Sequence, residues 1–385
     1  MTGLLSLLKD SFRDIFHRPE GNTSSLDGLR ALAILLVLGM HTNEFFLHRN
    51  LHLSVLNQLP PFKGGWVGVP LFFVLSGYLI GGQIWKEYLQ SGTLKFGRFV
   101  LRRGFRIWPL YYFLACFFFF FKIGGEKSLN GFISNLLFLS NYCFDNGPIF
   151  GAWSISTEEH FYILTPMILL SCLYFFGKRD LKFFRKIMII SFFFPLAARY
   201  VTWNFILNLK EFELNPYMLN IYRPIHTNSE GLIIGMFIAN LKMDTSFNWN
   251  QLMKRKWPLL ICALVLMSLS YSSKVYFNFS GIALGFGALL FICLDDKNLI
   301  SKFFSLKFFY PISKTSFAIY LVHIYLINYS FNYALSQNWF DQFQILSPLL
   351  GFGLVTVSSF IVSVGLYVVL ERPFLKLRNK MVKYS

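Results

Sequence analysis

Charge is scarce in this sequence, where charged residues make up 14% of 385 positions and hydrophobic residues make up 55%. Apolar runs recur from Leu29 to Leu370, and no long glycine, serine or proline linker divides them. A soluble enzyme of this length would not carry so much buried-type surface. The composition therefore predicts an all-α, polytopic membrane protein with one integral domain over residues 26–375 and no separate soluble catalytic module.

Cysteine and cleavage signals are also sparse. The five cysteines are odd in number, and most lie in apolar runs, so we expect neither a disulfide framework nor a metal site. Residues 1–25 have mixed charge and no small-residue cleavage site, while Leu8, Phe12 and Ile15 share one helical face. This pattern predicts an interfacial amphipathic segment and excludes a signal peptide.

The formal net charge of +17 could indicate a nucleic-acid partner, so its distribution matters. With the N-terminus in the cytoplasm, about 28 of the 36 lysines and arginines fall in cytoplasmic segments, including the basic tail 376–385. The positive-inside rule thus explains the charge with about ten membrane helices and both termini cytoplasmic, and no nucleic acid is needed. The expected spans are 29–47, 66–85, 106–121, 158–176, 187–204, 229–241, 257–272, 279–294, 315–333 and 346–370.

One further apolar piece, 131–142, is too short to span a bilayer. Counting it as a span would reverse every later loop, so we expect it to lie flat or re-entrant on the outer side.

The first span carries Arg30 near its start and His41 near its far end, which a helix places about 16 Å apart on one face. Such groups are costly in an apolar segment, so a matched pair predicts a polar path. Thr42, Asn43 and Glu44 extend that path beyond His41.

Two other features allow a structural and a functional interpretation. Ser76, in mid-helix, can bond back to its own backbone or take part in chemistry. Arg102, Arg103 and Arg106 precede a span, where arginines commonly fix topology, but guanidinium forks also suit the phosphates of coenzyme A.

On the outer side, Trp153, Glu158 and Glu159 lie near the expected start of the fourth span. A hydroxyl residue within 154–157 is expected to cap this helix, and one acid would complement its dipole. A second acid exceeds what capping requires.

The next outer loop brings Arg223 and His226 before the sixth span, and Glu230 can serve the start of that helix. His323 lies in the middle of the ninth span, where an intramembrane histidine is either functional or bonded to a neighbouring helix.

Taken together, these motifs resemble the family-three integral-membrane acyltransferases, which O-acylate bacterial surface and exported glycans. The first-helix pattern of arginine, ten residues and histidine is matched by Arg30 and His41. A Phe-Phe-x-x-Ser-Gly-Phe motif is matched by 72–78, with Tyr78 as its last residue, and Arg-Arg-x-x-Arg is matched by 102–106.

The resemblance continues to the C-terminal part of the chain. A Trp-Ser-Leu-x-x-Glu-x-x-Phe-Tyr pattern is similar to 153–162, Tyr-Leu-Val-His to 320–323, and Glu-x-Pro to 371–373. The sequence departs from the family at Pro70 and Glu230, where relatives often carry an acid and an aspartate, respectively.

The resemblance implies transfer of an acetyl or other acyl group from cytoplasmic acetyl-coenzyme A to a hydroxyl of an exported glycan, such as lipopolysaccharide O-antigen, or of a lipid-linked glycan. The setting would be the bacterial inner membrane, with membrane lipids as partners. The expected catalytic residues are His41, Glu44 and Glu158. The expected donor-binding residues are Arg30, Ser76, Arg102, Arg103 and Arg106. The expected acceptor or polar-path residues are Trp153, Arg223, His226, Glu230 and His323.

Several alternatives remain at this level. His41 can act as a general base, or His41 or Ser76 can carry an acyl group, while Arg30 can bind coenzyme A or stabilise an oxyanion. From another class, a transporter or flippase of a glycan or lipid-linked precursor would use Arg30, His41 and His323 as a path, although no inverted repeat is evident. A glycan polymerase fits poorly because the outer loops are short.

Overall fold

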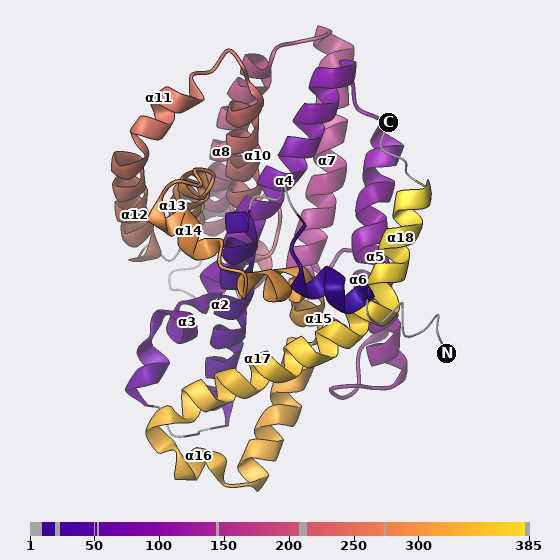
Figure 1. Cartoon of the computed structure of the whole chain (residues 1–385), viewed down its shortest axis with the longest axis vertical. Coiled ribbons are helices and arrows are strands. Elements are labelled where there is room, and N and C mark those ends of the chain that lie inside the picture. Colours follow the sequence, from indigo (N-terminus) through magenta and orange to yellow (C-terminus); the bar gives the residue numbers. More distant parts are fainter. Residues whose placement is uncertain are drawn as a thin grey trace. The chain divides into compact units, whose positions relative to one another are not determined.

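The computed structural model describes residues 10–19, 24–49, 51, 54–143, 146–207, 214–272 and 275–381. These residues form helices and connecting turns, with no strand among them (Figure 1). The longer helices are α2 (Ser24–His48), α4 (Gly68–Ser91), α5 (Phe96–Phe120), α7 (Ala152–Phe176), α8 (Leu181–Val201), α10 (Glu230–Met243), α12 (Lys256–Ser272), α13 (Asn278–Cys293), α15 (Phe309–Ser336) and α17 (Ser347–Leu366).

The all-helical prediction is confirmed for the described residues, and each of the ten expected spans lies mainly within a helix. Among the described residues, four helical stretches are long and apolar enough to cross a membrane: Ser24–His48, Gly65–Ser91, Ala152–Phe176 and Gln344–Met381. These apolar helices indicate a membrane protein. The number of crossings and the cytoplasmic placement of the termini stay predictions.

The shorter helices join these elements. They are α3 (Pro60–Lys63), α6 (Leu129–Leu136), α9 (Leu214–Tyr217), α11 (Trp249–Lys254), α14 (Leu299–Phe304), α16 (Trp339–Gln342) and α18 (Arg372–Met381). The piece expected to be too short to span, 131–142, overlaps α6, which has 8 residues and is about 12 Å long.

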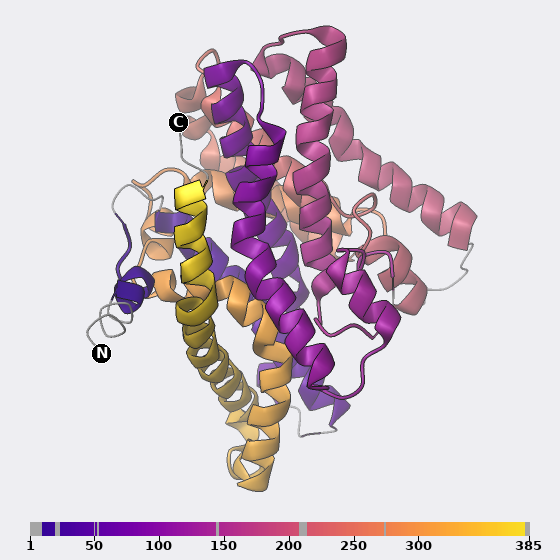
Figure 2. The same ribbon diagram turned by 90° about the vertical axis from the view of Figure 1, so that its right-hand side faces the viewer.

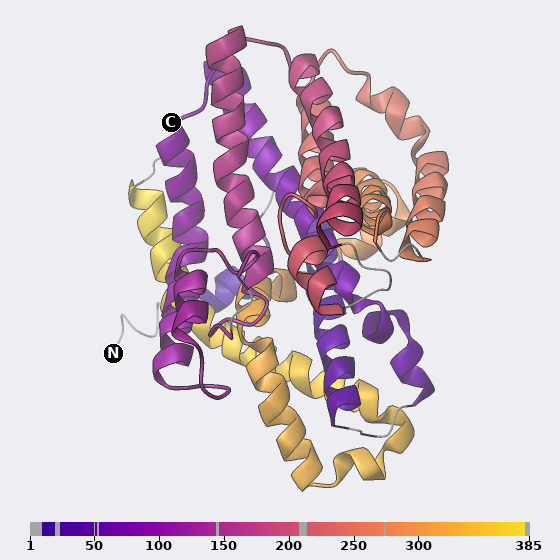
Figure 3. The same ribbon diagram turned by 180° about the vertical axis from the view of Figure 1, so that it is seen from behind.

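The chain divides into two compact units, which we describe separately. Unit 1 comprises residues 1–69, 104–126 and 302–385, and unit 2 comprises 70–103 and 127–301. In unit 1, α2 packs against α15 and α17, which meet at α16 (Figure 3). Phe331 fixes this corner, since its ring centroid lies 5.1 Å from that of Phe46 and 5.0 Å from that of Phe340.

The expected amphipathic segment 1–25 lies only partly within the described residues, which exclude 1–9 and 20–23. In unit 1, Ile15 is buried while Phe12 and Phe16 are about half exposed. The C-terminal part is tied to this segment, because the Arg372 Nε donates to Asp14 Oδ2 at 2.6 Å. The last four residues of the expected basic tail, 382–385, also lie outside the described residues.

In unit 2, α4 and α10 pack so closely that their backbones touch. A Cβ on Gly77 would lie 2.0 Å from the Leu232 carbonyl oxygen, and one on Gly235 would lie 2.0 Å from that of Val74. Small residues permit this approach between helices in apolar surroundings. The crossing holds Ser76, next to Gly77, at the centre of unit 2.

We predict that Gly77→Ala lowers the thermal stability of the purified protein. The added methyl group meets backbone, which cannot move aside, and overpacking of this kind costs about 1–3 kcal/mol. The matched control is Gly82→Ala on the same helix, since a Cβ there would meet nothing within 4 Å. Thermal unfolding in detergent should separate the two variants, and equal unfolding temperatures would contradict the close crossing.

Candidate functional site

One polar group of unit 1 lies near the start of α2, where Arg30 meets α15. Its Nη1 donates to Ser313 Oγ at 3.3 Å and lies 3.9 Å from Asp27 Oδ1. Ser313 Oγ also donates to Asp27 Oδ1 at 3.2 Å, and Arg18 Nε donates to Asp27 Oδ2 at 3.0 Å. The Arg30 guanidinium is therefore held in place by a carboxylate and a hydroxyl group.

Further along the same pair of helices, His41 lies beside His323. Their ring centroids are 5.2 Å apart, and the Nδ1 of His41 is 2.6 Å from Glu44 Oε2. The His41 side chain is largely buried, whereas Glu44 is about half exposed. The structure thus brings together three of the predicted site residues, His41, Glu44 and His323. Arg30 lies on the same helix, α2, about three turns away.

The hydrogen bonds define which ring nitrogens carry protons. A carboxylate only accepts, so Nδ1 of His41 donates to Glu44 and, in a neutral ring, Nε2 keeps its lone pair. His323 behaves alike, because its Nδ1 lies 2.7 Å from the Tyr320 carbonyl oxygen, which also only accepts. The buried Nε2 of His323 has no hydrogen-bond partner among the described residues. The arrangement offers imidazole nitrogens that can take a proton.

A second polar group lies in unit 2, around Tyr162. The Ser76 Oγ is 2.6 Å from the Tyr162 hydroxyl oxygen, and this hydroxyl donates to Glu158 Oε2 at 2.7 Å. Arg103 completes the group, with its Cζ 5.7 Å from the Tyr162 ring centroid. Ser76, Glu158 and Arg103 were predicted as site residues, but the tyrosine that links them was not given a role.

The arginine motif lies within α5 and covers about one helical turn. Arg103 is buried, Arg102 is partly buried and Arg106 is exposed. Since residues three or four apart share a helix face, Arg106 follows Arg102 and Arg103 along one side of α5.

The loop before α10 contributes a third polar group, also in unit 2. The Tyr142 hydroxyl lies 3.2 Å from His226 Nδ1, and the two rings stack with an interplanar angle of 5°. His160 stacks on the other side of this cluster, its centroid 5.9 Å from that of Tyr142. Partial burial lowers the pKa of His226, so its ring is neutral near pH 7 and its Nδ1 can accept a hydrogen bond from the Tyr142 hydroxyl.

The backbone of the predicted residue Arg223 is bonded to α7, because its carbonyl oxygen accepts from Thr157 Oγ1 at 3.2 Å. Trp153 is buried and packs edge-on to Phe73, 6.2 Å between centroids, and against Tyr222 at 4.8 Å.

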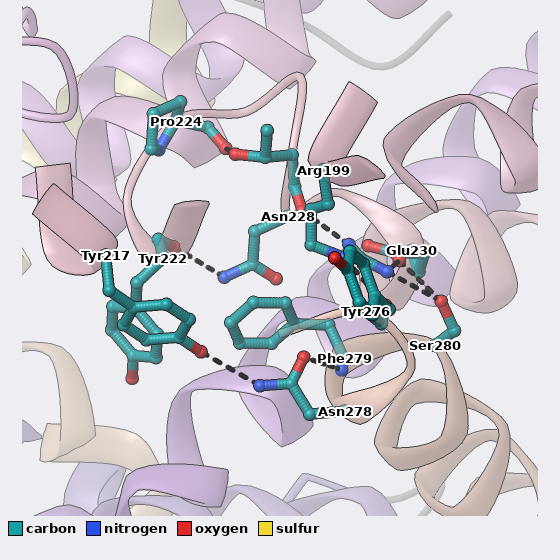
Figure 4. Close-up of polar contacts among 11 residues, drawn as sticks. Arg199, Tyr217, Tyr222, Pro224, Asn228, Glu230, Tyr276, Asn278, Phe279 and Ser280 are labelled. Atoms are coloured by element: carbon teal, nitrogen blue, oxygen red, sulfur yellow. Dashed lines mark hydrogen bonds and ion pairs between the residues drawn. The ribbon is translucent and has the colours of Figure 1, made fainter. Parts of the chain in front are cut away.

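Glu230 takes part in a fully buried ion pair in unit 2 (Figure 4). Arg199 Nη2 lies 2.6 Å from Glu230 Oε1, and both side chains are 0% exposed. Ser280 Oγ donates to the same carboxylate oxygen at 2.7 Å. The other Arg199 nitrogens donate to carbonyl oxygens, Nε to Tyr276 at 2.9 Å and Nη1 to Thr227 at 2.5 Å. This pair joins α8, the loop before α10, α10 itself and the start of α13.

One expectation about the fourth span was wrong. The helix begins at Ala152, and Gly151 precedes it without a side-chain cap. Ser156 and Thr157 donate back to the carbonyl oxygens of Ala152 and Trp153, at 3.0 Å each. Glu158 and Glu159 therefore lie in the second turn, away from the unbonded N–H groups that an acid would complement.

Comparison with known proteins identifies the family. A family model described as an acyltransferase domain matches residues 23–368. The chain belongs to this acyltransferase family.

Curated relatives extend the comparison. The chain is 24% identical over 329 residues to the O-acetyltransferase OatA of Staphylococcus aureus (strain NCTC 8325 / PS 47), covering 78% of this chain and 50% of that protein. It is 25% identical over 345 residues to the putative O-acetyltransferase SACOL0978 of Staphylococcus aureus (strain COL), covering 80% and 51%. The chain spans about half the length of these curated relatives. No solved structure matches it.

Four polar residues that the structure places at the candidate sites were not predicted from the sequence. Asp27 and Ser313 hold Arg30, Tyr162 links Ser76 to Glu158, and Arg199 pairs with Glu230. Tyr162 lies inside a motif and Asp27 lies three residues before another, so their positions were a usable signal. Arg199 stood out as a cation within an apolar span, which in itself demands a buried partner.

We predict that Arg199→Met destabilises the protein strongly, by about 3–5 kcal/mol, because it leaves the Glu230 carboxylate buried without its counter-charge. The double variant Arg199→Met/Glu230→Leu should recover much of that loss, since no charge then remains buried. Thermal unfolding measures both.

The control for this pair is Lys122→Met, whose partner Glu126 is largely exposed. Water and salt screen such a surface pair, so losing it should change the unfolding temperature little. If the double variant were as unstable as the single one, the structural role assigned to the ion pair would be wrong.

Proposed function

We propose that this acyltransferase is an O-acetyltransferase that moves an acetyl group from acetyl-coenzyme A to a hydroxyl of an exported or cell-surface glycan, such as lipopolysaccharide O-antigen. Its setting is the bacterial cytoplasmic membrane, which it crosses with about ten helices and both termini in the cytoplasm. The family match and the O-acetyltransferase relatives support the reaction class. The observation that carries the proposal is the His41–Glu44 pair of α2.

In this proposal His41 is the general base. Its Nδ1–H is held by Glu44, so Nε2 points its lone pair at the reacting hydroxyl and removes the proton as the oxygen attacks the acetyl carbonyl carbon. The carbon–sulfur bond then breaks, and the thiolate leaves and receives the proton from His41. Glu44 stabilises the imidazolium that forms between these two proton transfers, as a carboxylate does in other base–carboxylate pairs.

His323 restricts the charge that this part of unit 1 can carry. Two imidazoles with centroids 5.2 Å apart repel each other when both are protonated. Because His323 is 1% exposed, it stays neutral beside His41. A neutral neighbour leaves only one imidazole to charge during the reaction.

Arg30 and the α5 arginines serve the donor. Arg30, fixed by Asp27 and Ser313, supplies a preorganised positive charge for the thioester oxygen or for coenzyme A. Arg102, Arg103 and Arg106 offer guanidinium groups that suit its phosphates.

We predict that His41→Gln abolishes acetyl transfer at normal protein level. A general base supplies a factor of about 10² to 10⁴, and glutamine cannot take the proton. The assay is acetyl transfer from radiolabelled acetyl-coenzyme A to glycan by purified protein, with donor affinity measured by calorimetry. Donor affinity should stay near that of the wild type, since the base acts on the acceptor.

The matched control is His48→Gln, which changes an exposed histidine at the end of the same helix. If the rate of acetyl transfer by His41→Gln were within a few-fold of that of the control, the catalytic role assigned to His41 would be wrong. Loss of donor binding along with activity would move His41 to a donor-site role.

We further predict that replacing Arg102, Arg103 and Arg106 with glutamine weakens acetyl-coenzyme A binding. Each lost charge-assisted phosphate bond costs about 1.5–3 kcal/mol, enough for calorimetry to detect. Lys86→Gln, an exposed cation at the end of α4, is the control. Unchanged affinity together with altered membrane topology would show that these arginines fix orientation instead.

A further inference from the structure

Unit 2 contains a cleft beside its third polar group, and His226 of that group lines it. Helices α7 and α8 are joined by the short segment 177–180 and then diverge, and Figure 2 shows the two helices separating below their connection. The space between them has a volume of about 280 Å³, with α10 along its floor. Its walls include Leu164, Ile168, Ile187, Ser191, Ile233 and Met236.

The cleft opens between two apolar helix faces. Ile168 on α7 and Phe194 on α8 line it and are 54% and 60% exposed, respectively. Their neighbours Met167 and Phe193 are also exposed. Because α7 is long and apolar enough to cross a membrane, this mouth faces hydrocarbon and not water.

The dimensions of the cleft favour one extended chain. On α8 its lining runs from Phe184 to Phe194, about 15 Å along the helix. The cleft is therefore elongated along α8, so that one stretch of an extended hydrocarbon chain can lie in it.

One end of the cleft is polar. Ile225, His226 and Ser229 line this end, and His226 is bonded to Tyr142, whose ring is about half exposed. Imidazole, hydroxyl and aromatic faces at the end of an apolar channel suit a molecule with a hydrocarbon chain and a sugar head group. None of the residues that line the cleft is charged.

We infer that this cleft binds the chain of a single-chain lipid carrier whose saccharide is the acetyl acceptor, with the saccharide at the Tyr142–His226 end. The inference rests on the proposed function and names its acceptor class. It gives His226, predicted as an acceptor residue, a place at the boundary between chain and sugar.

Photo-crosslinking tests the inference without requiring activity. The probe is a polyprenyl-diphosphate disaccharide with a diazirine in its chain, added to the full-length protein in nanodiscs of phosphatidylethanolamine and phosphatidylglycerol. We expect label on the peptides that contain Ile168 and Ile187. Excess unlabelled lipid-linked disaccharide should remove this label, and excess phospholipid should not.

A matched pair of variants locates the chain. Ile187→Trp fills the cleft, whereas Ile190→Trp adds the same ring three residues away, on a side chain that is 72% exposed and outside the cleft. Label, and the ratio of kcat/KM for lipid-linked over water-soluble saccharide, should therefore fall about tenfold or more in Ile187→Trp only.

The outcomes separate this inference from the proposed function. Label competed equally by phospholipid, or equal in the two variants, overturns the carrier site and indicates bulk lipid in the cleft. Label competed by long-chain acyl-coenzyme A instead assigns the cleft to the donor and also overturns it. If the protein transfers acetyl groups but takes up no specific label, only the carrier site in the cleft is refuted. If it is labelled specifically but transfers no acetyl groups, only the proposed activity is refuted.

Discussion

The buried guanidinium of Arg199 is the constraint on which unit 2 depends. A cation with 0% exposure has no water to solvate it, so the chain has to supply every partner. It does so from two segments far apart in sequence, with Glu230, Ser280 and the carbonyl oxygens of Thr227 and Tyr276. Because Thr227 follows His226, this one charge also fixes the loop that forms the polar end of the cleft.

Unit 1 also has buried polar groups, but they differ from Arg199 in how they are bonded. Along α2 and α15 the polar groups are only partly satisfied: His323 Nε2 and the buried Thr42 Oγ1 have no hydrogen-bond partner among the described residues. Unsatisfied buried groups are costly and persist where chemistry needs them. Each nitrogen of the Arg199 guanidinium is bonded, which fits a structural role, although Glu230 Oε2 beside it has no hydrogen-bond partner among the described residues. The histidines of unit 1 have the lone pairs that proton transfer requires.

Apolar periodicity and length were enough to place the helices, because each expected span coincides with a helix of the described residues. The start of α7 could not be predicted from the apolar run. Gly151, with a positive φ of 74°, ends the preceding turn, and the helix starts six residues before the apolar run begins. Within α2, the 100° step of a helix predicted Arg30 and His41 on one face, and Glu44 one turn beyond His41. Contacts across helices were beyond such reasoning. The role of Tyr162 depends on Ser76 from α4, and the cleft depends on the divergence of α7 and α8, which no local pattern encodes.

The two interpretations of the α5 arginines apply to different members of the motif. An arginine that fixes topology has to reach lipid phosphates or water, and Arg106 is exposed enough to do so. Arg103 is 9% exposed and lies over the Tyr162 ring, so bulk headgroups cannot reach it. A guanidinium held in this way has already lost its rotamer freedom and binds a phosphate at lower entropic cost. Burial thus separates Arg103, which packs on Tyr162, from Arg106, for which the positive-inside effect is a sufficient account.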